Sequence, residues 1–193
     1  MNHWLEQFLL AFIPLFVAID PIGLIPVYMS MASNVPSEER NTVVVHAVST
    51  AFLVGVGFLF LGRLLFTALN ITEADFQIAG GLILLAVAGQ ELLGTDARNQ
   101  FASRDFGVVP LGMPMIAGPG MLTGVLALSD TVGTLITLTA LVSNLVIIWF
   151  ALRFSEAISH KIGATAMRAI SRFVALLLAA IAINLIRRGI QSV

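Results

Sequence analysis

The chain has 193 residues, of which 58% are hydrophobic and only 11% are charged, and its mean hydropathy is +0.97. Soluble domains carry about 25% charged residues, so this composition indicates a protein that crosses a membrane several times. The formal net charge of −1 gives no reason to expect a nucleic-acid partner, and the lack of cysteine excludes disulfides, thiolate nucleophiles and cysteine metal sites.

Six apolar segments follow one another, and each is close to the ~20 residues that cross a bilayer as a helix. Helices are expected because lipid satisfies no backbone polar group and because barrel strands would alternate strictly. Residues 5–31 have neither a basic leader nor a cleavage site, so they are expected to be retained and not to be a signal peptide. The predicted spans are 7–31, 43–62, 76–94, 107–128, 133–152 and 173–190.

The first span contains "AIDPIGLIPVY" (18–28), where Asp20, Pro21 and Gly23 stand in an otherwise oily helix. Proline removes a backbone donor, glycine weakens a helix interior, and a carboxylate in hydrocarbon costs roughly 2.5–3.5 kcal/mol. We therefore expect the helix to unwind here. Asp20 is predicted to bind a substrate ammonium or a coupling ion; the alternative is a helix cap for the half-helix that follows.

The fourth span contains a matching break at "AGPG" (117–120). Unwound carbonyls can hold a cation or an ammonium group, and the N-terminus of the next half-helix attracts a carboxylate. Two such breaks near the midplane would suit a small zwitterion, although two proline kinks that only shape packing are the alternative. The residues expected to bind substrate here are Gly118, Pro119, Gly120 and, one turn later, Thr123.

The two halves of the chain resemble each other. At an offset of 94, Gln90 aligns with Asn184 and Ser49–Thr50 with Ser143–Asn144, while Pro21 aligns with Pro119 at an offset of 98. Three spans per half invert the second half in the membrane, as in many transporters. The predicted fold is an all-α membrane protein of six transmembrane helices, an inverted 3+3 repeat with helices 1 and 4 broken. Its parts are residues 1–94, a polar connector 95–106, and residues 107–193.

Polar residues in the other spans are weaker candidates. Asn144 is expected to contact substrate, and Ser143, Ser49 and Thr50 are secondary candidates for a cavity between spans 2 and 5; hydrogen bonding between helices is the alternative. Gln90 and Asn184 lie late in their spans, where gating or interface contacts compete with substrate binding. No metal site is expected.

Arginine and lysine predict the orientation. The connectors after spans 1, 3 and 5 carry seven of these residues and the opposite side carries three, so both termini are expected outside the cell. The first group is Arg40, Arg98, Arg104, Arg153, Lys161, Arg168 and Arg172, and the second is Arg63, Arg187 and Arg188. The long connector 153–172 is expected to be an amphipathic segment at the interface.

At "AIDPIGLIPVY" and "PLGMPMIAGPGMLTGV" (110–125) the sequence resembles the MarC family of the LysE transporter superfamily, and the resemblance covers nearly the whole chain. It implies six helices, an inverted repeat, a bacterial or archaeal inner membrane, and transport of small neutral amino acids such as glycine and alanine with a proton or sodium gradient. The motif positions are Asp20, Pro21, Gly23 and Pro26, and Pro114, Gly118, Pro119 and Gly120.

The sequence thus predicts a secondary transporter of small zwitterions, a symporter in the lipid bilayer with no cofactor beyond a coupling proton or Na⁺, and with Asp20 as the coupling residue. A divalent-metal exporter is the first alternative, but hard cations prefer several carboxylates and the spans show one. An intramembrane enzyme lacks paired aspartates, HExxH or a serine–histidine pair. A non-transporting membrane protein is the last alternative. Substrate, direction and oligomeric state stay open.

Overall fold

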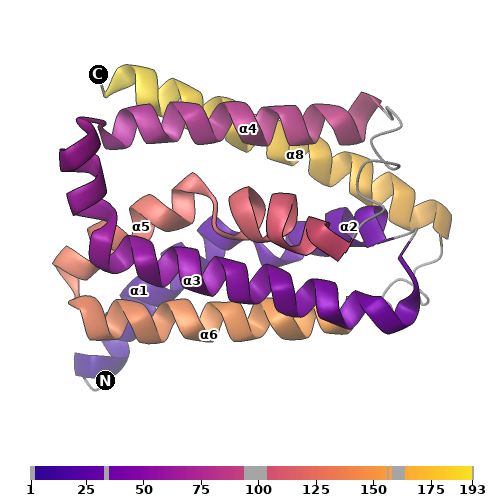
Figure 1. Ribbon diagram of the computed structural model, residues 1–193, viewed down its shortest axis with the longest axis horizontal. Helices are drawn as coiled ribbons and strands as arrows, with labels where there is room; N and C mark the ends of the chain where they lie inside the picture. Colours follow the sequence, from indigo (N-terminus) through magenta and orange to yellow (C-terminus); the bar gives the residue numbers. More distant parts are fainter. Residues whose placement is uncertain (1–2, 33–34, 94–103, 156, 158–163, 193) are drawn as a thin grey trace.

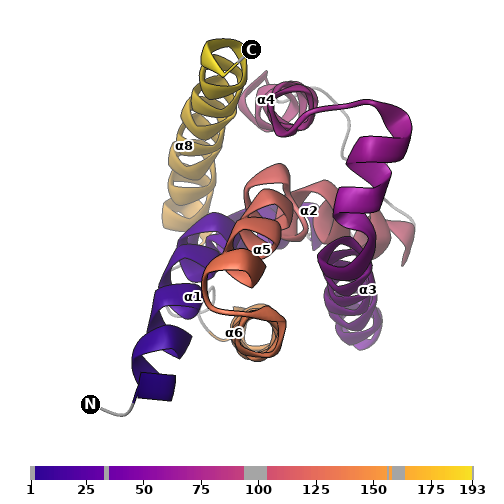
Figure 2. The same ribbon diagram turned by 90° about the vertical axis from the view of Figure 1, so that its left-hand side faces the viewer.

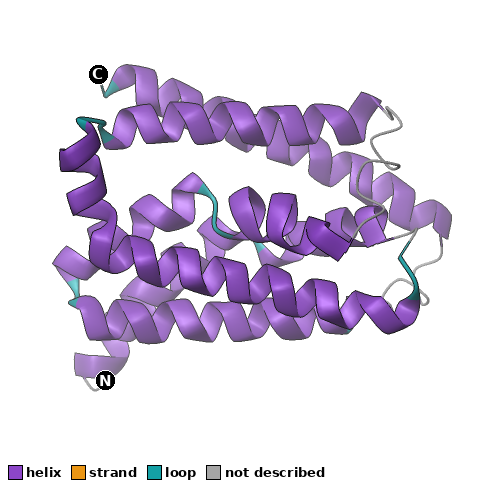
Figure 3. Cartoon of the chain, viewed as in Figure 1, coloured by secondary structure: helices purple, strands orange, loops and turns teal. Residues whose placement is uncertain are grey.

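The computed structural model describes residues 3–32, 35–93, 104–155, 157 and 164–192, and every regular element in these ranges is helical (Figure 3). The helices are connected by short turns wherever the connection is described. In chain order they are α1 (His3–Ile19), α2 (Pro21–Met31), α3 (Ser37–Leu69), α4 (Glu73–Leu93), η3 (Arg104–Gly107), η4 (Val108–Ile116), α5 (Pro119–Thr131), α6 (Thr134–Arg153) and α8 (Ala164–Gln191).

The helices form three groups, seen from the side in Figure 1 and from one end in Figure 2. Helices α4 and α8 make an antiparallel pair along one side, and α3 and α6 lie along the other. Helices α2 and α5 lie between these pairs, together with η4, and α1 runs from the centre along α6 to the edge of the molecule. The two breaks therefore lie near the middle of the bundle.

Four segments are long and apolar enough to cross a membrane, and a bent pair of helices makes a fifth if it counts as one span. They correspond to the predicted spans 1, 2, 5, 6 and 4. The predicted third span is α4, which does not meet the same test within the described residues, so the count of six spans stays a prediction. The four segments are His3–Met31, Ser37–Leu69, Thr134–Arg153 and Arg172–Gln191, and the pair Val108–Ile116 and Pro119–Thr131 bends by 47°.

Several helix boundaries differ from the predicted ones. Helix α3 is longer at both ends than span 43–62, and Figure 1 shows its last turns leaving the line of the helix to reach α4. Asn70, in the left-handed region at φ 52°, ends it. Of the predicted connector 153–172, residues 164–172 belong to α8 and residues 158–163 lie outside the described chain.

Helix α4 begins with a reciprocal cap. The backbone N–H and hydroxyl of Thr72 donate to Asp75 Oδ2 at 2.8 and 2.7 Å, and the N–H of Asp75 donates back to Thr72 Oγ1 at 3.1 Å. These bonds from Thr72 to the Asp75 carboxylate hold the pKa of Asp75 below its usual value, and the backbone bond contributes more than the hydroxyl bond. The cap satisfies amides at the helix start that have no intrahelical acceptor.

Small residues bring α4 and α8 into backbone contact. A Cβ atom on Gly81 would lie 2.8 Å from the Ala182 carbonyl oxygen, and one on Gly189 would lie 2.8 Å from the Ala74 carbonyl oxygen. Buried small residues recur every seventh position on both helices, at Ala74, Gly81 and Ala88 and at Ala175, Ala182 and Gly189. Lipid provides no hydrophobic drive to associate helices, so close packing of this kind stabilises the pair.

Gly81→Ala should therefore destabilise the protein while Gly89→Ala should not. The added methyl at position 81 would press on the α8 backbone, an overpacking that costs about 1–3 kcal/mol. Gly89 lies on the same helix, and a Cβ atom added there would have no other atom within 4 Å, so it is the matched control. Thermal unfolding of both purified variants in one detergent measures the difference, and equal midpoints would contradict the packing described here.

Candidate functional site

The first break lies at Asp20, where the structure confirms the predicted interruption of the helix. Helix α1 ends at Ile19, Asp20 adopts the left-handed conformation (φ 49°, ψ 67°), and α2 begins at Pro21. Aspartate tolerates this conformation better than most residues, and proline suits the first helical position. The Asp20 carboxylate accepts a hydrogen bond from the Gly23 N–H at 3.1 Å, so it caps the second half-helix.

Gly23 is the residue that this cap requires. A Cβ atom at position 23 would lie 2.3 Å from Asp20 Oδ2 and 2.9 Å from its Cγ. Any side chain there would displace the carboxylate, since real Cβ contacts are never that short. Asp20 itself is half-buried, whereas Pro21 and Gly23 are buried. The predicted residues of the first motif thus form one local unit.

The second break lies between η4 and α5, at Ala117 and Gly118. Gly118 is extended (φ −80°, ψ 169°), and α5 begins at Pro119 with no side chain capping it. The first half of this span is also irregular, which the sequence analysis did not predict. Val109 and Met113 have extended dihedral angles inside η4, and each precedes a proline. Proline disfavours helical geometry in the residue before it, so the VP and MP pairs were the available signal.

The two breaks lie against each other. A Cβ atom on Gly120, at the start of α5, would be 3.8 Å from the Cβ of Ala18, at the end of α1. One turn further, a Cβ on Gly124 would be 3.5 Å from Leu15. From the other side α4 contacts the break, because a Cβ on Gly80 would be 2.3 Å from the Pro119 ring. Segments that are about a hundred residues apart in sequence thus meet at one place.

The two half-helix N-termini differ in electrostatics. The start of α2 has its own carboxylate, whereas the start of α5 has no side-chain cap. The amides of Gly120 and Met121 are among the first of α5, where a helix offers no internal acceptor. An exposed N-terminus carries partial positive charge and attracts anions. One break therefore offers a carboxylate, and the other offers a helix N-terminus with partial positive charge.

Asn144 is a fully buried amide in the middle of α6. Its Nδ2 donates to the Phe12 carbonyl of α1 at 3.2 Å and to the Ala140 carbonyl at 2.9 Å. Its Oδ1 is buried and accepts no hydrogen bond from the described residues. A buried acceptor without a donor is uncommon and marks a candidate position for a ligand or a water molecule.

The hydroxyl groups predicted near the site bond within their own helices. Thr123 donates to the Pro119 carbonyl at 2.8 Å, Ser143 to Thr139 at 2.7 Å, and Ser49 to Val45 at 2.6 Å. Thr50 is half-buried and its Cβ faces the backbone of Gly112 in η4. A hollow lies between α3 and α6, the helices of spans 2 and 5, but its walls are apolar and include none of these residues or Asn144.

The structure does not place Gln90 and Asn184 at the breaks, as far as these two residues are described. Asn184 is half-buried on α8 and accepts a hydrogen bond from Arg187 at 3.1 Å. The side chain of Gln90 lies outside the described part of the chain. Their alignment as repeat mates stays a prediction.

Comparison with known proteins gives one consistent result. The family model described as "MarC family integral membrane protein" matches residues 5–193. The chain is 30% identical to the UPF0056 membrane protein YhcE of Escherichia coli, over 94% of this chain and 91% of that protein. It is 28% identical to the UPF0056 membrane protein YvbG of Bacillus subtilis (94% and 92%) and 27% identical to a UPF0056 membrane protein of Methanocaldococcus jannaschii (97% and 98%). No solved structure matches the chain.

The two roles of Asp20 can be separated by substitution. Asp20→Ala should lower the free energy of unfolding by about 1 kcal/mol, because the α2 cap is lost and alanine is strained at positive φ. Asp20→Asn should stay close to wild type, since asparagine accepts the same bond and tolerates the same dihedral angles. Chemical or thermal unfolding in detergent measures both. If Asp20→Asn destabilises as much as Asp20→Ala, the cap is not what holds α2 in place.

Proposed function

The chain belongs to the MarC family of integral membrane proteins, and from this premise we propose that it is a secondary transporter of small neutral amino acids of the glycine and alanine class. Transport proceeds by alternating access around the two helix breaks and is coupled to a proton or sodium gradient. The observation that carries the proposal is the contact between the breaks, with Gly120 of one against Ala18 of the other. Broken helices that meet in a bundle are the usual construction of transporter sites.

We further propose that the fold is the predicted inverted repeat of three plus three spans. The pattern of helix contacts supports it, because exchanging the halves reproduces most of the contacts between the helices. The exchange maps α1 onto η4, α2 onto α5, α3 onto α6 and α4 onto α8. The contact between α1 and α6 then corresponds to the contact between η4 and α3. The contact between α2 and α8 corresponds to that between α5 and α4, and the contact between α2 and α6 corresponds to that between α5 and α3. All six contacts occur. The contact of α5 with α6 has no counterpart of similar extent between α2 and α3.

The substrate is a zwitterion in this proposal because the site has complementary ends. Its carboxylate binds the uncapped start of α5 through the amides of Gly120 and Met121. Its ammonium group binds the Asp20 carboxylate. The Asn144 Oδ1 lies beside Phe12, two turns before Asp20 on α1, and is proposed as a second acceptor on the path of the substrate. Glycine and alanine line the meeting point, so only a small side chain fits. Pro21, Gly23, Gly118 and Pro119 shape the two breaks that hold these groups.

Asp20 is also the proposed coupling residue, since the described spans offer no second carboxylate at the breaks. Its carboxylate already accepts a backbone hydrogen bond, so a proton or Na⁺ arriving there would compete with the cap of α2. Loosening that cap would move the half-helix that lines the site. Ion binding and the conformation of the broken helix are coupled by this competition.

The proposed orientation follows the positive-inside rule. Both termini lie at the same end of the molecule (Figure 1). At that end Arg63 of α3 pairs with Asp130 of α5, which agrees with the assignment of both connectors to one side. The opposite end of the molecule holds the starts of α3 and α8 and the end of α6. Arg40 and Arg153, from the larger group of basic residues, belong to these helix ends. We place that end in the cytoplasm.

The first test is uptake of labelled glycine and alanine into proteoliposomes under an imposed proton or sodium gradient. Asp20→Asn should reduce gradient-driven uptake by about tenfold or more, because the ammonium and the coupling ion lose their charged partner. Asp130→Asn neutralises an exposed carboxylate at a helix end and is the matched control, expected to transport normally.

The outcomes separate the parts of the proposal. Uptake that persists in Asp20→Asn would leave Asp20 as a helix cap and remove it from the coupling mechanism. No uptake by the folded wild-type protein of either amino acid under either gradient would refute the assignment of substrate class.

Asn144→Leu tests the second acceptor. We expect a small change in stability, because the loss of two hydrogen bonds is offset by removal of an unpartnered buried oxygen. Glycine uptake should fall about tenfold if that oxygen binds the ammonium. Thr137→Val, also buried on α6, is the control and should keep its uptake. Normal uptake in folded Asn144→Leu would assign the amide to packing of α1 on α6.

A further inference from the structure

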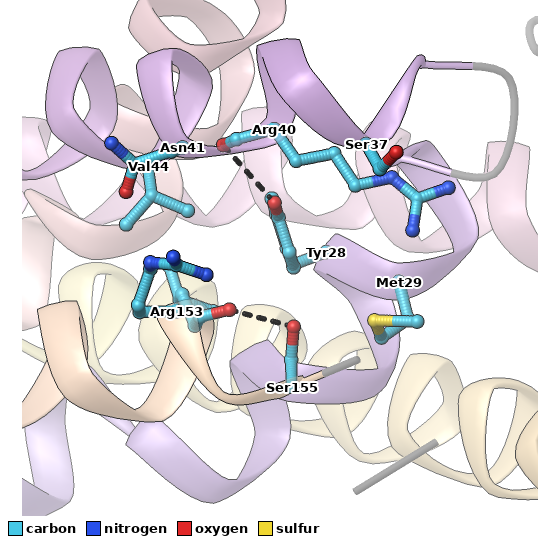
Figure 4. A pocket seen from close by; sticks show the side chains of 9 residues that line it. Tyr28, Met29, Ser37, Arg40, Asn41, Val44, Arg153 and Ser155 are labelled. Atoms are coloured by element: carbon cyan, nitrogen blue, oxygen red, sulfur yellow. Dashed lines mark hydrogen bonds between the residues drawn. The ribbon is translucent and has the colours of Figure 1, made fainter. Parts of the chain in front are cut away.

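A polar hollow lies where the end of α2, the start of α3 and the end of α6 come together (Figure 4). It is a shallow depression that opens to the surroundings. Its polar lining comes from three elements, with Tyr28 from α2, Ser37, Arg40 and Asn41 from α3, and Arg153 from α6. No carboxylate is among its described lining residues, so the hollow is lined by donors and positive charge.

Internal hydrogen bonds hold the walls of this hollow in place. The Tyr28 hydroxyl donates to the Arg40 carbonyl at 3.3 Å, and Arg40 Nε donates to the Val35 carbonyl at 3.0 Å. The first bond ties the end of α2 to the start of α3 (Figure 4), and the second ties the connector before α3 to the first turn of that helix. The side chain of Arg153 is exposed and makes no hydrogen bond or ion pair with the described residues. Its guanidinium is thus available to an anion.

A second, apolar hollow lies between the same two helices, α3 and α6. It exposes no polar surface. Val48 and Phe52 line it on α3, and Val142, Leu145, Val146 and Trp149 line it on α6.

Helical spacing places the two hollows one after the other along a single seam. The lining residues of α3 recur at 37, 41, 44, 48 and 52, and those of α6 at 142, 145, 149 and 152, steps of three or four that keep to one face. From Asn41 to Phe52 the helix rises about 17 Å, close to the length of an extended acyl chain. One turn beyond the apolar hollow, Gly55 of α3 contacts Leu141 of α6, so the two helices are packed together there.

We propose that this seam binds one anionic phospholipid. Its phosphate lies in the polar hollow against Arg153, with Ser37 and Asn41 as further donors, and one acyl chain lies in the apolar hollow beside Trp149. Charge complementarity and the order of the two hollows support this occupant, because only an amphiphile matches a cationic pocket followed by an apolar groove. Basic pockets between transmembrane helices at the cytoplasmic side suit anionic headgroups. A tyrosine at this level suits the membrane interface.

Fluorescence of Trp149 reports on the groove directly. The chain has two tryptophans, so Trp4→Phe leaves Trp149 as the single tryptophan, which excitation at its long-wavelength edge selects. The purified protein is reconstituted in phosphatidylcholine vesicles. One sample contains a minor fraction of phosphatidylglycerol with a brominated acyl chain, and the other contains the same fraction of brominated phosphatidylcholine. Bromine quenches tryptophan only at contact. We expect the brominated phosphatidylglycerol to quench with an apparent association constant about fivefold higher, the effect of one arginine near a membrane surface.

Two pairs of variants locate the site. Arg153→Gln should abolish the preference for phosphatidylglycerol, whereas Arg188→Gln, an exposed arginine of α8 at the other end of the molecule, should keep it. Val146→Phe fills the apolar hollow and should reduce quenching by both lipids, whereas Val17→Phe on the exposed face of α1 should not.

Each outcome decides the proposal. A preference for phosphatidylglycerol over phosphatidylcholine that survives an excess of inorganic phosphate and disappears in Arg153→Gln supports a bound lipid. Equal quenching by the two lipids would overturn it, leaving general lipid contact only. Loss of the preference on addition of inorganic phosphate would overturn it in favour of a site for free anions. The test does not involve transport, so it stands apart from the outcome of the uptake experiments.

Discussion

The structure depends on one constraint, that a helix interrupted inside a membrane must satisfy the backbone groups which the interruption releases. Lipid offers no hydrogen bonds, so irregular backbone persists only where protein or a cavity surrounds it. Both breaks obey this rule. They lie in the middle of the bundle, with α4 and α8 on one side and α3 and α6 on the other. Each break has protein on at least one side, although Val17 and Ile22 beside the first break stay exposed.

Only the first break is capped by a side chain, and that difference gives the candidate site its chemistry. Asp20 supplies its own carboxylate to the start of α2, and Gly23 leaves the space for it. The start of α5 has no such side chain. An inverted repeat of identical halves would bind two identical groups, whereas this pair provides a negative group and a positive helix end. A molecule with one carboxylate and one ammonium group complements the pair.

Close packing by small residues places the breaks against their neighbours. Pro119 sits on Gly80 of α4, and α4 in turn lies against α8 through Gly81 and Gly189. A larger residue at position 80 would push α4 away from the second break, and one at position 81 or 189 would separate α4 from α8. The contact between α3 and α6 is built differently, with bulky side chains that leave hollows along the seam. The seam between α4 and α8 is thus tightly packed, whereas the seam between α3 and α6 is not.

The features that arise within a few residues were predictable from the amino-acid sequence alone: the apolar helices, the break at Asp20, and the break before Pro119. Proline, glycine and a buried carboxylate act locally, so their positions predict interruption without knowledge of the neighbours. The extended residues Val109 and Met113 were predictable on the same ground, and so were the bonds from the hydroxyls of Thr123, Ser143 and Ser49 to carbonyls of their own helices.

Contacts between distant segments had to come from the folded structure. Gly120 lies beside Ala18, and Asn144 reaches Phe12 while its oxygen accepts no hydrogen bond from the described residues. Such contacts depend on how helices cross, and an apolar sequence constrains that crossing weakly because nearly every face of every helix can meet either lipid or protein.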